Sequence, residues 1–209
     1  RFDFCLRLAT MKAMSASLHI LAVVGSREPT SSTRTVVVHL AEALRGAGCT
    51  VDLLDLSQEA MSLYTPSTTP AQPGFPELKA RIVRADVFLL GTPDYHGSVS
   101  GVLKNFLDHF WREFTGKLFV PLVASHEKGL TVMDQLRTVA RQCYAWALPY
   151  GVSFRDPADV ANGQIVSDAL RERLAMTARD VRVYGTLLAR QRQADLAGSD
   201  PGFLARLRG

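Results

Sequence analysis

The chain has 209 residues, of which 47% are hydrophobic and 21% charged, with a formal net charge of +4. This is the composition of one globular domain, and the absence of a basic run interleaved with aromatic residues argues against nucleic acid as a partner. No apolar run reaches the length of a membrane span, and Cys5, Cys49 and Cys143 are too scattered for a disulfide framework or a zinc site. We therefore expect a single cytoplasmic domain with reduced thiols, no membrane contact, no metal and a small anionic ligand.

Residues 1–16 are basic but lack the apolar core of a secretory signal. We interpret them as an N-terminal extension upstream of a start at Met11 or Met14, with a transit peptide as the alternative. Residues 17–192 then form one domain, and an irregular tail follows over 193–209.

Short apolar runs alternate with stretches of helical periodicity from residue 17 onward. The apolar runs predict strands at 18–24, 49–56, 86–93, 116–125 and 150–156. The periodic stretches predict helices at 34–48, 77–85, 99–114, 130–147 and 166–193. A segment rich in Pro, Ser and Thr predicts a long surface loop over 57–76, which serves either as a plain connection or as a lid or arm.

The first, third and fourth of these strands are almost purely apolar, which is typical of a parallel sheet covered by helices on both faces. The sequence therefore predicts a doubly wound α/β domain with five parallel strands. In such a sheet the ligand binds at the carboxyl ends of the strands. The candidate loops are those after strands one, three and four, at 25–33, 92–101 and 125–129.

The first of these loops, GSREPTSST, has five hydroxyl side chains just before a helix: Ser26, Thr30, Ser31, Ser32 and Thr33. It has neither the GxGxxG of dinucleotide folds nor the GxxxxGK[ST] of P-loops. Hydroxyl donors beside the positive end of a helix favour a phosphate monoester, with Arg27 as a neutralising charge. The alternative is a Ser/Thr-rich helix cap, although a cap requires only one such residue.

Two motifs together resemble the NADPH-dependent FMN reductases, a family of flavodoxin-like proteins. GSREPTSST fits that family's GSxxxxSx[ST/N] phosphate loop, and residues 92–108 fit its TPxYxxxxxxxLKNxxD segment. The resemblance covers about residues 17–190 and implies a flavodoxin-like fold with bound FMN. Its phosphate contacts fall on Ser26, Ser31 and Thr33, with Ser32 beside them. The family often has Arg where this chain has Glu28, so Arg27 faces either the phosphate or solvent.

The resemblance also implies that the backbone over 93–98 runs along the flavin ring. This segment adds six residues to the predicted site: Pro93, Asp94, Tyr95, His96, Gly97 and Ser98. The residues alone allow a simpler interpretation, in which 94–97 form a turn and Tyr95 is a half-buried anchor. After the fourth strand, SHEKG adds Ser125 and Gly129 where the family often has several glycines. No side chain is expected to act as a catalyst, because the redox chemistry belongs to the cofactor.

The helix expected after the third strand has an apolar stripe wider than one sheet-facing side requires. Phe110 and Trp111 are therefore expected to protrude toward another subunit, and a deeply buried helix is the alternative. The resemblance implies a homodimer or homotetramer that completes the flavin pocket across such an interface.

The activity that the resemblance implies is hydride transfer from NAD(P)H to FMN, followed by electron transfer to a small-molecule acceptor. That acceptor is a quinone, free flavin, oxygen, an azo dye or an oxidised metal ion. A flavodoxin-type electron carrier is one alternative, disfavoured because such carriers are typically acidic whereas this chain carries +4. A flavin-supplying partner of a monooxygenase, which releases FMN as a product, is the other.

Overall fold

The computed structural model describes residues 17–59 and 61–208. The interpretation of residues 1–16, with Cys5, lies outside these residues. One parallel sheet forms the centre of the chain, with the order β2 (Thr50–Asp55), β1 (His19–Val24), β3 (Val87–Tyr95) and β5 (Leu118–Ala124). Its fifth position is shared by β6 (Trp146–Ala147) and β7 (Val152–Phe154), which both pair with β5 in parallel. This order confirms the predicted doubly wound sheet, and the strand order reverses between β1 and β3.

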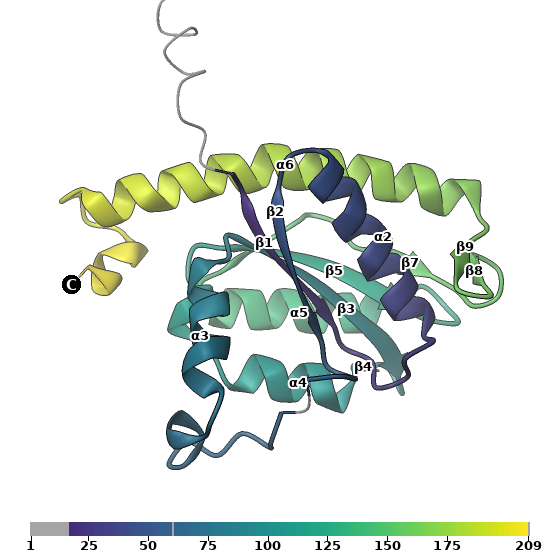
Figure 1. Cartoon of the computed structure of the whole chain (residues 1–209). Coiled ribbons are helices and arrows are strands. Elements are labelled where there is room, and N and C mark those ends of the chain that lie inside the picture. Colours follow the sequence, from purple (N-terminus) through teal and green to yellow (C-terminus); the bar gives the residue numbers. More distant parts are fainter. Residues whose placement is uncertain (1–16, 60, 209) are drawn as a thin grey trace, which may run out of the picture.

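Helices cover both faces of the sheet (Figure 1). One face packs against α2 (Ser32–Gly46) and the long α6 (Asp168–Ala197), through buried side chains such as Ile20, Leu40 and Val181. The other face packs against α3 (Phe75–Arg84), α4 (Gly101–Asp108) and α5 (Leu130–Gln142). Alternate residues of β1 supply the two cores, because successive side chains of a strand point to opposite faces.

The helix predicted over 99–114 is shorter than expected. It ends at Asp108, and a 3₁₀ turn, η2, follows at Arg112–Phe114. This break turns Phe110 back into the core, where it is 4% exposed and stacks on Phe75 with ring centroids 5.8 Å apart. The expectation that Phe110 protrudes is therefore wrong, whereas Trp111 is 56% exposed as predicted.

The helix predicted over 130–147 also ends early, because Tyr144 takes a positive φ of 55° just after α5. The chain then enters the sheet as β6, leaves it over 148–151, and returns as β7. The strand predicted over 150–156 is thus present as β7, whereas β6 forms where the sequence predicted the end of a helix. The opposite edge of the sheet is β2, whose Val51 and Leu53 carbonyl oxygens accept hydrogen bonds from the guanidinium groups of Arg45 and Arg81.

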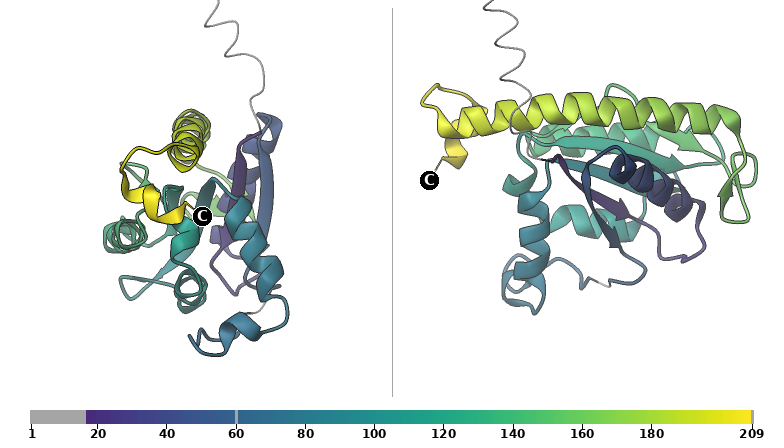
Figure 2. Two further views of the ribbon diagram at one scale, coloured as in Figure 1. Left: turned by 90° about the vertical axis from the view of Figure 1, so that its left-hand side faces the viewer. Right: turned by 45° about the horizontal axis from the view of Figure 1, so that its top comes forward.

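Several short elements were not predicted from the sequence. Within the expected loop over 57–76 the chain forms a 3₁₀ turn, η1 (Thr69–Ala71), and α3 begins at Phe75. The strands β4 (Ser98–Val99), β8 (Val160–Ala161) and β9 (Gln164–Ile165) form two hairpin contacts. The tail expected to be irregular contains η3 (Phe203–Leu207), which buries Leu204 beside the end of α6 (Figure 2).

Cys49 and Cys143 are free thiols, as predicted. Burial raises the pKa of Cys143 to about 11. No helix in the described part of the chain is both long enough and apolar enough to cross a lipid bilayer.

Candidate functional site

The three predicted loops meet at the edge of the sheet where β1, β3 and β5 end. Two side chains join them. The hydroxyl of Ser100 donates a 2.6 Å hydrogen bond to the carbonyl oxygen of Gly25, which connects the first loop to the start of α4. The hydroxyl of Ser125 donates a 2.9 Å bond to Asp94 Oδ2, which connects the second loop to the third. The three loops that the sequence analysis selected therefore lie side by side at the carboxyl ends of the strands.

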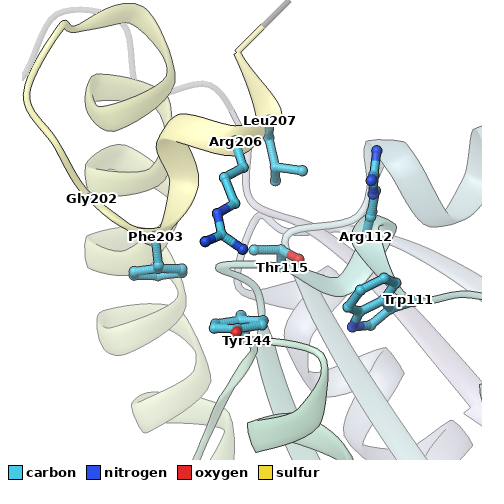
Figure 3. A pocket seen from close by; sticks show the side chains of 8 residues that line it. All are labelled: Trp111, Arg112, Thr115, Tyr144, Gly202, Phe203, Arg206 and Leu207. Carbon is cyan, nitrogen blue, oxygen red and sulfur yellow. The ribbon is translucent and has the colours of Figure 1, made fainter.

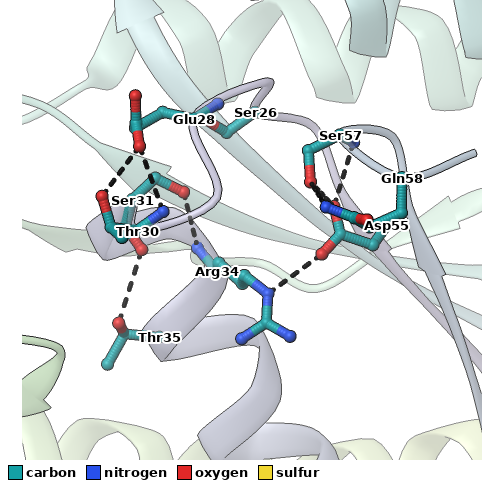
Figure 4. A network of polar contacts seen from close by, with 9 residues as sticks. All are labelled: Ser26, Glu28, Thr30, Ser31, Arg34, Thr35, Asp55, Ser57 and Gln58. Atoms are coloured by element: carbon teal, nitrogen blue, oxygen red, sulfur yellow. Dashed lines mark hydrogen bonds and ion pairs between the residues drawn. The ribbon is translucent and has the colours of Figure 1, made fainter. Parts of the chain in front are cut away.

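The first loop places two of its hydroxyl groups at the start of α2 (Figure 4). Ser26 is buried, and its oxygen accepts the N–H of Glu28 at 3.2 Å. Ser31 is the N-cap of α2, and its oxygen accepts the N–H of Arg34 at 3.2 Å. The capping interpretation is thus confirmed for Ser31. Both hydroxyl groups act only as acceptors here, so each still has a proton to donate.

Thr33 carries the clearest unfilled hydrogen-bonding capacity of this loop. It is 1% exposed, and its Oγ1 is the one buried side-chain nitrogen or oxygen of the described chain that has no hydrogen-bond partner. The N–H groups of Ser32 and Thr33 also lack an acceptor among the described residues, since the first bond to a helix carbonyl runs from Thr35 N–H to Ser31. These donors face no acidic residue in the first turn of α2. They match an anion at the positive end of a helix.

The charged residues of this loop point away from the protein, which is the solvent-facing alternative for Arg27. Arg27 is exposed and makes no ion pair with a described residue, whereas Glu28 accepts two hydrogen bonds from Thr30, and these lower the pKa of Glu28. The cation fixed beside the loop is Arg34, whose Nε lies 3.0 Å from Asp55 Oδ2 (Figure 4). The sequence analysis missed Arg34, because its position within a helix gives no sign that it pairs with the end of β2.

The second loop is a tight hairpin between β3 and β4. His96 and Gly97 both have positive φ values, of 57° and 75°, and Tyr95 pairs with Ser98 across them. This is the geometry of a two-residue hairpin turn, for which Gly at the second position is well suited. The strand therefore continues two residues beyond Pro93, where it was expected to end. Tyr95 is 57% exposed, so it is not the half-buried anchor of the simpler interpretation.

Two polar side chains hold this hairpin in place. Asp94 Oδ1 accepts the N–H of Gly97 at 2.8 Å while its other oxygen accepts from Ser125. Gln135 of α5 accepts from the Ser98 hydroxyl at 3.0 Å and donates to the Gly97 carbonyl at 3.1 Å. Nothing in the sequence marks Gln135, because a Gln on a helix surface is ordinary. Asp94, Ser98 and Ser125 thus position the loops through bonds within the protein.

A cleft of about 790 Å³ opens beside the second and third loops. Its lining includes Asp94, Lys128, Gly129, Phe154 and Arg155. His126, Glu127 and Lys128 are exposed, whereas Ser125 and Gly129 are buried. The segment after β7 was not predicted to contribute to the site, because its approach to the third loop depends on the split fifth strand. Volumes of this size are typical of small-molecule and cofactor sites.

Known proteins resemble this chain in sequence and in structure. The sequence profile of a family described as NADPH-dependent FMN reductase matches residues 18–158. An FMN-dependent NADPH-azoreductase of Staphylococcus aureus is 28% identical over 143 residues, which are 65% of this chain and 76% of that protein.

Two solved structures show the same fold. The apo form of an NADH:FMN oxidoreductase superposes with a TM-score of 0.67 at 18% identity, covering 80% of this chain and 90% of that one. An archaeal flavodoxin superposes with a TM-score of 0.57 at 8% identity, covering 80% and 97%. The predicted flavodoxin-like fold is confirmed.

Proposed function

Because the chain belongs to the NADPH-dependent FMN reductase family, we propose that it holds FMN at the carboxyl edge of its sheet and passes electrons from NAD(P)H to a planar organic acceptor. The family makes it an oxidoreductase with FMN as cofactor and NAD(P)H as co-substrate. FMN, when bound, supplies the hydride and electron chemistry. The protein's own residues bind it, orient it and shape its surroundings.

The observation that carries this proposal is the buried, unpartnered hydroxyl of Thr33 at the start of α2. An unsatisfied buried polar group lowers the free energy of unfolding by about 1–3 kcal/mol. A ligand that accepts a hydrogen bond from Thr33 would offset this loss. The free protons of Ser26 and Ser31 and the N–H groups of Ser32 and Thr33 complete a set of donors without a carboxylate in the helix's first turn. Such a set fits the phosphate of FMN.

The flavin ring is proposed to lie along the hairpin over 93–98 and the third loop over 125–129. Asp94 and Ser125 act as positioning residues, because the bond between them fixes the spacing of these two loops. His96 stays exposed in the turn and is assigned no proton transfer. Hydrogen bonds between Gln135 of α5 and the backbone of Gly97 and Val99 further fix the conformation of the hairpin.

The acceptor is proposed to be a planar organic molecule such as a quinone, a free flavin or an azo compound. The cleft of about 790 Å³ beside the second and third loops supports this class, because it suits a ligand with several rings and stays open toward solvent. If FMN were instead released as a product, the purified protein would lose its yellow colour on desalting.

Substitution of Thr33 by Val tests the phosphate site. Valine keeps the shape of threonine but removes the hydroxyl, so FMN binding should weaken by about 2 kcal/mol, as expected for a hydrogen bond to a charged group. Riboflavin, which lacks the phosphate, should bind the variant and the wild type equally. Fluorescence quenching titrations measure both affinities. Thr30→Val is the matched control, since Thr30 is exposed and bonded to Glu28; unchanged FMN affinity in Thr33→Val would place the phosphate elsewhere.

Anaerobic stopped-flow absorbance tests the enzymatic activity. Excess NADH or NADPH should bleach the FMN-loaded protein directly to the two-electron-reduced state, and turnover with a quinone should follow ping-pong kinetics. If dithionite reduces the protein, but neither nucleotide does so within minutes, the protein is an electron carrier and the proposal fails.

The assembly is proposed to be a homodimer or homotetramer. Exposed apolar side chains on the outer face of α6, including Met176, Val183 and Leu187, support a contact between copies. Light scattering coupled to size-exclusion chromatography measures the mass directly, and a monomer at micromolar concentration contradicts this part of the proposal.

A further inference from the structure

A second cavity lies at the amino ends of the strands, just before β5 and β6 begin, and so at the other end of the strands from the candidate FMN site (Figure 3). Its volume is about 290 Å³, and its lining includes Trp111, Arg112, Thr115, Tyr144, Phe203 and Arg206. The seven residues of β5 separate it from Ser125, a distance of roughly 20 Å at about 3.3 Å per residue. The cavity is therefore separate from the proposed FMN site.

Four aromatic side chains are exposed together around this cavity. The exposed fractions of Trp111, Tyr144, Trp146 and Phe203 lie between 43% and 56%. The rings of Tyr144 and Phe203 stack with centroids 6.3 Å apart, and Trp146 meets Phe203 edge-on at 6.5 Å. The stacked pair also borders an adjoining cavity of about 330 Å³, which includes Trp146 and Arg141. Tyr144, Phe203 and Trp146 thus form one exposed aromatic cluster, and Trp111 lines the same cavity as Tyr144 and Phe203. Exposed apolar patches of this kind mark interaction sites.

The backbone at Tyr144 is strained in a way that favours this interpretation. Its φ is 55°, at a position after a helix where glycine is usual. A non-glycine residue in that conformation costs roughly 1 kcal/mol or more. The chain bears this cost while the ring projects to the surface and contacts Phe203, instead of filling the core.

The charged side chains that line both cavities are all arginines, while Glu113, behind Trp111, is paired with Lys79. Arg112, Arg141 and Arg206 make no side-chain hydrogen bond or ion pair with a described residue, and no Asp or Glu lines either cavity. Figure 3 shows the guanidinium group of Arg206 pointing from the C-terminal segment toward Tyr144 and Thr115. Guanidinium groups beside aromatic faces bind carboxylate and sulfonate groups while a flat ring stacks alongside.

From this arrangement we propose that the cavity binds a small planar aromatic anion, such as an aromatic carboxylate or sulfonate. A cavity of about 150 Å³ accommodates benzene, so 290 Å³ is sufficient for two fused rings. The ring contacts Tyr144 and Trp111, and the anionic group pairs with Arg206. The site is independent of FMN, so its test does not require a working active site.

The chain contains two tryptophans, and both lie on this surface, which gives a direct readout. The full chain, labelled with ¹⁵N, is titrated with naphthalene-2-sulfonate while the indole N–H signals of Trp111 and Trp146 are followed by NMR. We expect saturable shifts in the Trp111 signal at submillimolar probe. The neutral analogue 2-naphthalenemethanol should bind much more weakly.

Three variants separate this site from nonspecific contact. Arg206→Gln should weaken sulfonate binding about tenfold without changing the binding of the neutral alcohol. Arg182→Gln, whose charge lies near Cys49, is the matched control and should bind as the wild type does. Tyr144→Gly should weaken binding while thermal stability stays equal or rises, because glycine relieves the positive φ.

The proposal is overturned by any of three results. The first is the absence of saturable shifts in the wild type. The second is equal affinity for the sulfonate and the alcohol, or equal binding by Arg206→Gln and Arg182→Gln. The third is a dependence of the indole signals on protein concentration alone, with no response to the probe, which would show that a second copy of the chain covers the surface.

Discussion

The carboxyl ends and the amino ends of the strands carry different kinds of polar and apolar groups. Where the strands end, hydroxyl groups, backbone N–H groups and a tight hairpin form the candidate FMN site, and side chains such as Ser100 and Asp94 join its loops. Where the strands begin, exposed aromatic rings and arginines form the second cavity. The first edge offers donors fixed by the backbone, and the second offers donors on flexible side chains.

The direction of the helices explains much of this difference. In this fold the helices start where the strands end, so their positive ends gather at the FMN edge. Their carbonyl ends gather at the other edge and require cations. Lys117 Nζ donates to the Ile82 and Val83 carbonyls near the end of α3, at 2.7 and 2.8 Å. Arg192 Nε similarly donates to the Thr115 carbonyl at 3.0 Å. Basic side chains thus satisfy carbonyl oxygens at this end of the strands, where the arginines of the second cavity also lie.

The double change Ser26→Ala and Ser31→Ala should have the largest effect, because it should affect ligand binding at the candidate FMN site and leave the second cavity unchanged. It removes two donors from the phosphate site, so FMN should bind about 2–4 kcal/mol more weakly, whereas riboflavin and naphthalene-2-sulfonate should be unaffected. Calorimetric titrations compare the three ligands. Loss of the Ser31 cap also costs about 1 kcal/mol of unfolding free energy, so urea denaturation must accompany the titrations. An equal loss of riboflavin affinity would contradict the phosphate assignment.

Lys117, at the amino ends of the strands, should make the free energy of unfolding of the protein depend on pH. Burial, assisted by the charge of Arg192, lowers the pKa of Lys117 from 10.5 to about 7. Between these values the unfolded chain holds the proton and the folded chain does not, so the free energy of unfolding rises with pH. Below pH 7 both states are protonated, and the folded state carries the full cost of a buried charge.

Lys117→Met removes the titrating amino group, and with it this part of the pH dependence of the free energy of unfolding. Relative to the variant, the wild type should gain about 2 kcal/mol of unfolding free energy between pH 7.5 and pH 9, at about 1.4 kcal/mol per pH unit. Urea denaturation at the two pH values measures the difference. Parallel pH profiles for variant and wild type would show that Lys117 keeps its proton in the folded chain.

Gly25→Ala probes the packing beside the candidate FMN site. An added Cβ would lie 2.5 Å from the Gly91 carbonyl oxygen and 2.8 Å from Leu103 Cβ, where β1 meets the start of α4. Overpacking of this kind costs about 1–3 kcal/mol, and FMN affinity should fall with it. Gly101→Ala is the control, since nothing lies within 4 Å of its added Cβ. Thermal denaturation that ranks the two variants equally would contradict this packing argument.

The sequence predicted those parts of the fold that local patterns specify. Continuous apolar runs located β1, β3 and β5, and hydroxyl groups located the start of α2, because burial and capping leave local signatures. Phe110 was misplaced because its burial depends on Phe75, a residue far away in the chain. The split between β6 and β7 was missed for a similar reason, since it depends on where Tyr144 ends α5.

The candidate site shows the same division. The hydroxyl-rich loop was evident from the residues, and the family resemblance selected Ser26, Ser31 and Thr33 within it and the segment over 92–108 that contains the hairpin. Gln135, Arg34 and Arg155 could not, because each reaches the site from an element whose own sequence is unremarkable. A single sequence does not indicate which side chains form contacts between distant secondary-structure elements.

The split fifth strand has a consequence for how the protein behaves in a crowded solution. An uninterrupted edge strand offers a row of unpaired backbone groups onto which another chain can add, and this is a common route to aggregates. Here the outer strand is broken between β6 and β7, so that edge offers no long template. On the opposite side, Arg45 and Arg81 occupy carbonyl oxygens of β2. Both outer strands of the sheet therefore offer fewer free backbone groups for the addition of another strand.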